Sequence, residues 1–592
     1  MNAIAPIARW SLQELPFGSP EALNAALARL DVLITELEAG RSQLSVGLPV
    51  DDLLELLQMQ ERIRDLCAQL EAYAYLLYAA NTQDSAVLSL RGRIEQALAD
   101  ADNRVMFFGL WFKGLSNEAA EPYIAAAGDL SYYLASLRRA KPYTLSEPEE
   151  KIINLKDLNG CQAMVELYEI ITTAFVFDLE VDGQQKHLTR DGLAQYYHHP
   201  SAELREAAYR ELYRVYGEQK TVLARIYTAL VRDWHSDVVQ LRGYASPISA
   251  RNLVNDLPDS VVHTLLEVCR RNASLFQRYF RLKARLLGMD KLRRCDIYAP
   301  VARADRSIEF DAAVPMILDS FRAFSPRIAQ AAERVLDLNH LDAEVRPGKR
   351  GGAFCYSVTP DFAPWVMVNY TGRIRDVTVL AHELGHAVHT LLASEHSVLT
   401  FHAPTPLAET ASVFAEMLVT DRLLTEESDA AVQRDLLMTI LDDAYATVQR
   451  QAFLSIFEQE AHAKIAAGCT SEELADAYLG NLFEQFGDAL DVDDQFAWEW
   501  IIVPHIFNSP FYTYAYAFGQ LLVLALYQRY LSEGEAFVPG YLRLLSYGGS
   551  AEPQAILREA GLDITSADFW QGGFDVLRAK LERLEQITGG RQ

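Results

Sequence analysis

Two histidines and a glutamate stand close together in the five-residue segment HELGH at 382–386. Apolar residues recur at helical spacing from 376 to 393, so residues four apart stand one turn above each other on a single face. Both imidazoles, His382 and His386, could then reach one metal ion at about 2.0–2.1 Å. Glu383 lies beside them, offset around the helix, where its carboxylate could reach water on that metal. This HExxH arrangement is typical of zinc hydrolases.

A catalytic zinc needs three protein ligands and one open position, so a third ligand must come from elsewhere. The candidates after the motif are Glu395, His396, His402, Glu409 and Glu416. The first two follow the zinc helix so closely that the chain would have to fold back sharply, and the third lies in an expected loop. A threonine–proline pair at 405–406 can begin a second helix, with Glu409 in its first turn. A carboxylate on a packed neighbouring helix suits a third ligand, so we choose Glu409.

Two further residues are expected to support the ligands. Glu416 lies seven residues beyond Glu409 on the same helix face, and we expect it to orient a ligand histidine. A solvated glutamate is the alternative. His389 follows His386 by one turn and is expected either in a similar supporting role or as a histidine buried in the core.

Several segments together resemble one protein family. They are HELGHAVH, the AETASVFAEML helix after it, GKRGGAFCYS and VNYTG upstream, KPYTLSEPEEKI, and PHIFNSPFYTYAYAFG downstream. They are similar to oligoendopeptidase F, in the thimet-oligopeptidase family of zinc metallopeptidases, from about residue 110 to near the C-terminus and more weakly before it. The resemblance implies one zinc ion per chain, held by His382, His386 and Glu409, with Glu383 as the catalytic acid and base.

A stretch at 500–528 contains no Asp, Glu, Lys or Arg. It is long enough to cross a membrane, but its prolines, histidine, asparagine and tyrosines argue against a lipid-facing helix. We expect it to be buried in protein. The resemblance implies that a histidine and tyrosines from it face the zinc and stabilise the oxyanion of the tetrahedral intermediate. The candidates are His505, Tyr516 and Tyr512, with Tyr514 left open by the register; an aromatic core stripe is the alternative.

A glycine pair leads into an expected strand at 352–357. Gly351 and Gly352, followed by Ala353, would let another chain approach closely, and a strand edge can pair with an extended peptide. A tight turn before an ordinary strand is the alternative. The resemblance also implies a helical body with a deep channel that admits short unstructured peptides and excludes folded proteins.

Most of the remaining chain has helical periodicity. Long helices are expected at 20–40, 51–80 and 84–112, and further helical tracts include 201–241, 259–287 and 430–467; strand signals are confined to 175–181, 352–357 and 365–370. The expected fold is mainly α, with a small β-sheet beside the zinc helix. The expected regions are an N-terminal helical region at 1–110, an oligoendopeptidase F-type N-terminal domain at 111–199 and a zinc metallopeptidase catalytic domain at 200–585.

Composition limits the partners of the chain. Its 592 residues include 54 Lys and Arg against 80 Asp and Glu, and a net charge of −26 disfavours nucleic acid or anionic membranes. The six cysteines form no CxxC pair, which argues against a zinc ribbon or a disulfide framework. No apolar signal-peptide core is visible at the start. We therefore expect a cytoplasmic enzyme that acts on oligopeptides; the oligomeric state is left open.

The main hypothesis is a zinc endopeptidase that hydrolyses internal bonds of short unstructured oligopeptides by Glu383-assisted attack of zinc-bound water. A zinc carboxypeptidase of the HExxH type is an alternative. Such an enzyme needs a cationic pocket for the terminal carboxylate of its substrate. Lys349, Arg350, Arg373 and Arg375 could supply that pocket. The other alternative is a non-catalytic helical peptide-binding scaffold with a vestigial metal site, against which the intact Glu383 argues.

Overall fold

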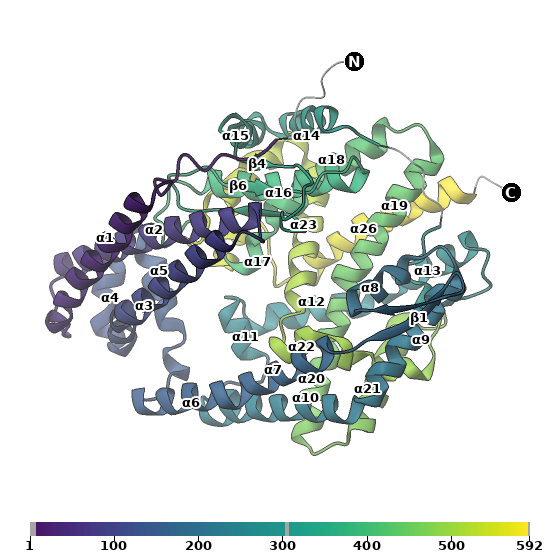
Figure 1. The fold of residues 1–592 in the computed structure, drawn as a ribbon, viewed down its shortest axis with the longest axis horizontal. Coiled ribbons are helices and arrows are strands. Elements are labelled where there is room, and N and C mark those ends of the chain that lie inside the picture. The colour runs from purple at the N-terminus through teal and green to yellow at the C-terminus, as the bar shows by residue number, and fades with distance from the viewer. Residues whose placement is uncertain (1–7, 302–306, 590–592) are drawn as a thin grey trace. The chain divides into compact units, whose positions relative to one another are not determined.

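The computed structural model describes residues 8–301 and 307–589, and these fold mainly into helices, as predicted (Figure 1). The described residues form two compact units that interleave along the chain. Unit 1 lies within the spans Met1–Lys141, Arg306–Glu426 and Arg529–Leu562, and unit 2 within Pro142–Asp305, Glu427–Gln528 and Asp563–Gln592. The expected regions at 1–110, 111–199 and 200–585 stay a prediction.

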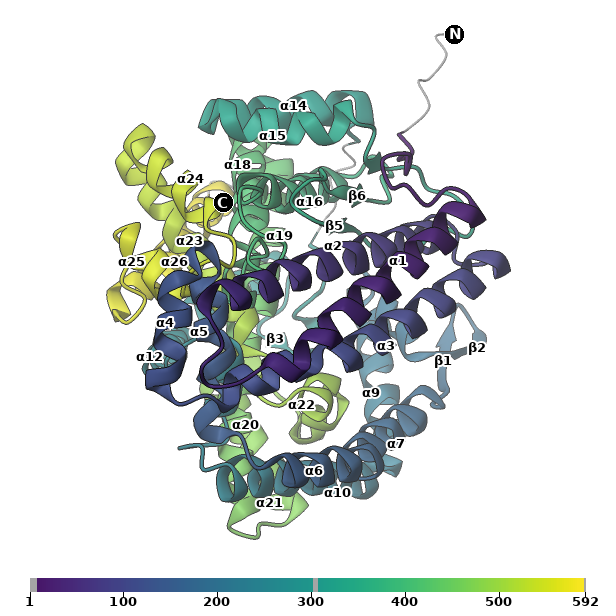
Figure 2. The ribbon, with the colours of Figure 1, turned by 90° about the vertical axis from the view of Figure 1, so that its left-hand side faces the viewer.

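Unit 1 contains the elements that surround the HELGH motif. They are α1 (Pro20–Ala39), α2 (Val50–Ala80), α3 (Ser85–Gly114), α4 (Asn117–Ala126), α5 (Ser131–Arg139), α14 (Phe310–Phe324), α15 (Pro326–Asp337), β4 (Leu341–Asp342), β5 (Phe354–Tyr356), β6 (Trp365–Met367), α16 (Ile374–Leu392), α17 (Thr405–Ala408), α18 (Thr410–Glu426), α24 (Val538–Ser546) and α25 (Pro553–Glu559). Helices α1, α2 and α3 lie side by side in both ribbon views (Figures 1 and 2). The predicted ranges 51–80 and 84–112 agree with α2 and α3 to within two residues, because long apolar repeats define both helices.

The beginning of α1 follows its capping residues. Ser19 accepts a hydrogen bond from the Ala22 N–H, and Pro20 occupies the first helical position, where no N–H is required. One face of the helix then buries Leu30 and Leu37 in a core shared with α2 and α3. The amphipathic pattern of α1 therefore decides which face packs inward.

A small sheet in unit 1 has the strand order β4-β6-β5. Strand β5 is antiparallel to β6, with Phe354 opposite Met367 and Tyr356 opposite Trp365, whereas β4 is parallel to β6. The side chains of the central strand are fully buried. Because β5 pairs with β6 on one side, its other side forms an edge of this sheet. Figure 2 shows β5 and β6 beside α16, with α15 and α18 packed on the same helix.

Unit 2 contains most of the remaining helices. They are α6 (Glu147–Asn159), α7 (Cys161–Thr173), β1 (Phe177–Val181), β2 (Gln184–Leu188), α8 (Arg190–Ala194), α9 (Ala202–Glu218), α10 (Lys220–Trp234), η5 (His235–Leu241), α11 (Ser249–Val254), α12 (Asp259–Arg271), α13 (Ala273–Leu286), β3 (Leu292–Arg293), α19 (Ala430–Ala444), η7 (Tyr445–Gln449), α20 (Arg450–Ala466), α21 (Ser471–Phe486), β7 (Leu490–Asp491), η8 (Asp494–Ile502), α22 (Pro504–Asn508) and α26 (Ala567–Gly589). Helix α23 (Tyr514–Glu533) begins in unit 2, and its last residues belong to unit 1.

Several predicted helical tracts are divided in the structure. The tract 201–241 becomes α9, α10 and the π-helical η5, and 430–467 becomes α19, the π-helical η7 and α20. The tract 259–287 is broken at Asn272, whose side-chain amide donates to the carbonyl of Val268 and to Gln571. Hydrogen bonds of this kind offer the backbone an alternative to a continuous helix, which apolar periodicity does not reveal.

The uncharged stretch at 500–528 is largely buried in protein, as predicted. It forms the end of η8, all of α22 and the first part of α23, and Trp500, Phe507 and Phe518 have 2% or less of their surface exposed. Among the described residues, no helix combines the length and apolar character that a bilayer crossing requires.

Candidate metal centre

Helix α16 and the residue that precedes α18 bring two histidines and a glutamate together. His382 and His386 lie one turn apart on α16, with ring centroids 4.9 Å from each other. Oε2 of Glu409 lies 3.3 Å from Nε2 of His382 and 3.5 Å from Nε2 of His386. Within the described ranges, this trio is the group whose possible ligand atoms all lie within 4.8 Å of one another. The structure thus places the three predicted ligands around one point.

The helix expected to run unbroken from Thr405 is interrupted at Glu409. Helix α17 ends at Ala408 and α18 begins at Thr410, with φ −86° and ψ 0° at Glu409. The expectation of a first-turn position for Glu409 is therefore wrong in detail. Glu409 lies in the break between the two helices, and its carboxylate is within 3.5 Å of both imidazoles.

The trio fits a zinc ion by donor type and by spacing. Two imidazole nitrogens and one carboxylate oxygen match the three-ligand set of catalytic zinc sites. Ligand atoms about 2.1 Å from a tetrahedral zinc lie about 3.4 Å apart. The separations of 3.3 and 3.5 Å between Glu409 and the two histidines match this value.

Polar groups lie beside two of the three side chains. Ser412, which is fully buried, donates a hydrogen bond of 2.7 Å from Oγ to Oε2 of Glu409. Oε2 of Glu416 lies 3.5 Å from Nδ1 of His382, the ring nitrogen that faces away from Glu409. Partners of this kind set the orientation of metal-ligating side chains.

The predicted supporting histidine lies behind the site. His389 is 6% exposed and lies one turn after His386 on α16. Burial lowers the pKa of each ring to about 4, so both are neutral at neutral pH. The structure thus places Glu416 and His389 beside the ligands, and their supporting roles stay predictions.

The electrostatics of the trio favour one bound positive charge, either a proton or a metal cation. Burial favours the neutral ring of His382, but its hydrogen bonds with Glu409 and Glu416 outweigh burial and raise its pKa to about 10. Burial likewise favours the neutral acid at Glu409, yet His382 and His386 lower its pKa to about 2. The carboxylate is therefore ionised, and either a proton on His382 or a metal cation can balance it.

Glu383 lies beside the trio and next to the edge strand. Only 7% of the residue is exposed, and burial raises its pKa to about 7, against the opposing effects of His382 and a hydrogen bond from the Cys355 backbone. Cys355 is the middle residue of β5. At the end of this strand, the Ser357 hydroxyl lies 2.6 Å from that of Thr390 on α16. The sheet edge therefore runs past the candidate base.

The predicted backbone-binding loop precedes β5. Gly351 and Gly352 are exposed, and a Cβ added to either would meet no described atom within 4 Å. Gly352 has φ +82°, a conformation that favours glycine. The Asn369 amide donates to the carbonyls of Arg350 (3.1 Å) and Gly352 (2.8 Å), which holds the loop from one side. Ala353 connects this loop to β5, and the binding role of all three residues stays a prediction.

Three of the predicted oxyanion residues cluster in unit 2. The ring of Tyr516 is 6.0 Å from that of His505 and 5.3 Å from that of Tyr512, and its hydroxyl lies 3.5 Å from Nε2 of His505. Tyr514 is fully buried instead, and its hydroxyl accepts a hydrogen bond from Asn255. The metal trio belongs to unit 1, so the part of this aromatic cluster in the reaction stays a prediction.

The other candidate ligands do not join the trio. His396 pairs with Asp129 (2.8 Å) and with the carbonyl of Ser546 (2.8 Å), and Glu395 is exposed. His402 lines a cavity of about 450 Å³ with residues of α2, α3 and α5. Of the cations considered for a carboxypeptidase, Lys349 has a fully buried side chain, and its Nζ lies 2.7 Å from Asp342. Lys349 is therefore already paired with an acidic side chain in the core of unit 1.

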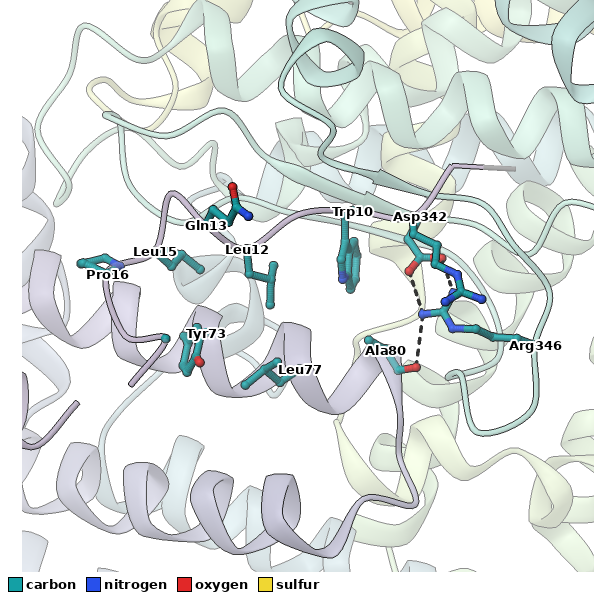
Figure 3. Close-up of a pocket in the computed structure, with 12 residues that line it drawn as sticks. Trp10, Leu12, Gln13, Leu15, Pro16, Tyr73, Leu77, Ala80, Asp342 and Arg346 are labelled. Atoms are coloured by element: carbon teal, nitrogen blue, oxygen red, sulfur yellow. Dashed lines mark hydrogen bonds and ion pairs between the residues drawn. The ribbon is translucent and has the colours of Figure 1, made fainter. Parts of the chain in front are cut away.

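A cavity of about 600 Å³ near the start of the chain contains none of the ligands (Figure 3). Trp10, Leu12 and Tyr73 are among its lining residues, and Asp342 and Arg346 lie at one end. The Arg346 guanidinium is already bound to both oxygens of Asp342, at 2.7 and 2.8 Å. The cavity is largely apolar, and its Arg346 and Asp342 side chains already form an ion pair with each other.

Sequence reasoning missed the packing role of Gly385. A Cβ at this position would lie 2.6 Å from the Ala411 carbonyl oxygen and 2.6 Å from Cα of Ser412. Glycine at the fourth position of HELGH thus allows α18 to approach α16 closely, next to Glu409. Ser412 lies one turn after Glu409 in the sequence, and this spacing could have indicated that it supports the Glu409 carboxylate.

Comparisons with known proteins agree with this geometry. A sequence profile described as Peptidase family M3 matches residues 195–576. Oligopeptidase PepF of Bacillus subtilis (strain 168) is 24% identical over 98% of this chain and 87% of its own. An oligoendopeptidase F homolog of Lactococcus lactis subsp. lactis (strain IL1403) is 25% identical, covering 99% of this chain and 98% of its own.

Solved structures show the same fold. A chain from Chlamydophila abortus superimposes with a TM-score of 0.90 at 24% identity, covering 98% of both chains. Oligoendopeptidase-F from Enterococcus faecium superimposes with a TM-score of 0.72 at 22% identity, covering 96% of this chain and 99% of that one.

Replacing Gly385 by alanine is expected to separate α16 from α18. The new methyl group would collide with backbone atoms, and overpacking of this kind typically costs about 1–3 kcal/mol. We expect a lower free energy of unfolding and zinc binding weakened at least about tenfold, measured by thermal unfolding and by titration against a chelating dye. Gly109→Ala on α3, where an added Cβ meets no described atom, is the matched control. Unchanged zinc affinity in Gly385→Ala would contradict the packing role.

Replacing Ser412 by alanine should weaken metal binding without unfolding the chain. The substitution removes the hydrogen bond that orients Glu409, and losses of such supporting contacts typically reduce metal affinity by about 10–100-fold. Competitive zinc titration measures the effect. Ser320→Ala on α14, a buried serine bonded to the Met316 carbonyl, provides the control. The role assigned to Ser412 is refuted if both variants bind zinc as tightly as the parent chain.

Proposed function

The chain belongs to peptidase family M3, and on that premise we propose that it is a zinc-dependent endopeptidase that cleaves internal bonds of short unstructured oligopeptides. The observation that carries the proposal is the convergence of His382, His386 and Glu409 within 4.8 Å, with Glu383 beside them. The printed names of the relatives, oligopeptidase and oligoendopeptidase, support oligopeptides as the substrate class.

The metal would be held by His382, His386 and Glu409. When bound, zinc polarises the scissile carbonyl and lowers the pKa of a coordinated water to about 7. Two neutral imidazoles and one carboxylate leave the ion with a net positive charge. Glu416 and His389 would keep the rings oriented.

Glu383 would move the protons. A general base accepts a proton from the attacking water and can then deliver it to the departing amine. Its burial places its pKa at about 7, so both protonation states are accessible at neutral pH. Its position beside the edge strand supports this role, because a peptide paired with β5 would lie against the same side chain.

The substrate backbone would pair with the edge of β5, next to Gly351, Gly352 and Ala353. Strand addition supplies main-chain hydrogen bonds that do not depend on the substrate's side chains. A peptide must be extended to bind in this way, which favours short unstructured substrates over folded proteins. Nothing in this arrangement requires a free carboxyl terminus.

The aromatic cluster of unit 2 would stabilise the negative charge that develops on the carbonyl oxygen. His505, Tyr516 and Tyr512 supply neutral donors, and removal of one such donor costs roughly 3–4 kcal/mol in comparable sites. Burial, with the positive charges of Arg450 and Arg190, lowers the pKa of His505, so its ring is neutral at neutral pH.

Replacing Glu383 by glutamine should abolish proton transfer while keeping the metal. We expect turnover to fall by about 10²–10⁴-fold, with zinc content near one ion per chain because the three ligands are intact. Peptide cleavage and elemental analysis measure the two quantities. Glu395→Gln, at an exposed glutamate just beyond α16, is the matched control and should keep full activity. Survival of turnover in Glu383→Gln would rule out the proposed mechanism.

Metal removal should stop the reaction reversibly. A chelator is expected to remove activity and added zinc to restore it, since the carbonyl would otherwise lack its activating cation. The assay substrate is an internally quenched peptide blocked at both ends. Cleavage of this peptide is expected of an endopeptidase; cleavage restricted to peptides with a free carboxyl terminus would instead identify the carboxypeptidase alternative.

A further inference from the structure

A buried glutamate of α20 holds the turn that joins α22 to α23. Within this turn, defined as residues 509–513, Phe511 has φ +57°, a left-handed conformation that is rare for a bulky side chain. Oε1 of Glu458 accepts a hydrogen bond of 2.8 Å from the Phe511 N–H. Glu458 is fully buried, and all of these residues belong to unit 2. The contact therefore acts at the strained residue itself.

Other contacts hold the turn on either side of Phe511. The Arg251 guanidinium donates to the Pro510 carbonyl (3.0 Å) and to the Ser509 hydroxyl (3.3 Å). The Thr513 hydroxyl lies 3.0 Å from that of Ser455, which is one turn before Glu458 on α20. The turn is thus tied to the body of unit 2 by several groups, but Glu458 supplies the bond to the Phe511 amide.

The left-handed residue decides where the neighbouring aromatic rings go. The Phe511 side chain is fully buried and packs against His462, with ring centroids 4.5 Å apart. Tyr512, the next residue, lies with His505 and Tyr516 instead. A sparsely populated conformation costs of order 1–3 kcal/mol and persists only where surrounding contacts impose it. Without its support, the backbone would relax and Tyr512 would leave the cluster.

We propose that Glu458 is a positioning residue for peptide hydrolysis: it accepts the Phe511 N–H, keeps that residue left-handed and thereby holds Tyr512 beside His505 and Tyr516. The inference rests on the proposed function, because the catalytic part of these three aromatic residues is itself proposed. Glu458 acts through the turn, and neither the metal trio nor the edge strand includes it.

The chemistry of Glu458 suggests a pair of diagnostic variants. Burial raises its pKa to about 8, although the Phe511 N–H and the charge of Arg251 oppose the shift. The hydrogen bond therefore needs an acceptor oxygen at the right distance more than it needs a charge. Glu458→Gln keeps that oxygen and its reach without the charge. Glu458→Asp keeps a carboxyl group but shortens the side chain by one methylene.

The test uses the full-length zinc-loaded chain with the Gln and Asp variants. Hydrogen exchange followed by mass spectrometry reports the protection of the Phe511 amide, and cleavage of the blocked peptide gives kcat and KM. We expect Glu458→Asp to exchange at least tenfold faster at 505–516 and to lose about 10–100-fold in kcat, with KM within threefold and zinc content unchanged. Glu458→Gln should stay within threefold of the parent chain in its exchange rate at 505–516 and in kcat. Glu460→Ala, at an exposed glutamate of the same helix, is the control.

Two results would overturn the inference. One is unchanged exchange at 505–516 in Glu458→Asp; the other is faster exchange with unchanged kcat. In the second case Tyr516→Phe separates the possible failures. A lowered kcat in Tyr516→Phe leaves the proposed function intact and refutes only the role of Glu458, whereas an unchanged kcat also refutes the contribution of Tyr516 as an oxyanion donor.

Discussion

The close approach of α18 to α16 is the constraint on which the metal centre depends. Because Gly385 has no side chain, the backbone at Ala411 and Ser412 can lie directly against the HELGH turn. That contact brings Glu409 to 3.3–3.5 Å from the two imidazoles. Close-packed interiors transmit small displacements, so an added methyl group here would change the spacing that the metal requires.

Burial gives the residues around this contact their chemical character. Glu383 is almost inaccessible to solvent and has a pKa of about 7, whereas Glu409, paired with His382, has a pKa of about 2. Two carboxyl groups in one site therefore differ in protonation because their surroundings differ. One is suited to proton transfer and the other to holding a cation. Strand β5 also lies beside α16, which places an edge of the small sheet next to Glu383.

Each compact unit supports a different part of the proposed chemistry. Unit 1 holds the metal trio, Glu383 and the edge strand, and unit 2 holds the cluster of His505, Tyr512 and Tyr516. Both units use the same physical device, a fully buried polar side chain that hydrogen-bonds to a group it positions. Ser412 does so for the Glu409 carboxylate, and Glu458 does so for the Phe511 amide.

The sequence by itself predicted the mainly helical fold and the HExxH pair, because these follow from periodicity and from spacing within one turn. The choice of Glu409, 23 residues after His386, depended on an expected second helix, and the structure places its carboxylate 3.3–3.5 Å from the two imidazoles. It also predicted the strands at 352–357 and 365–370. Only the tertiary structure decided which tyrosine faces which way. Tyr514 is buried and Tyr512 joins His505 because Phe511 is left-handed, and that conformation is imposed by Glu458, 53 residues earlier in the chain. Likewise, the need for glycine at 385 arises from backbone atoms of another helix. Such contacts between distant segments leave no periodic signal in the sequence.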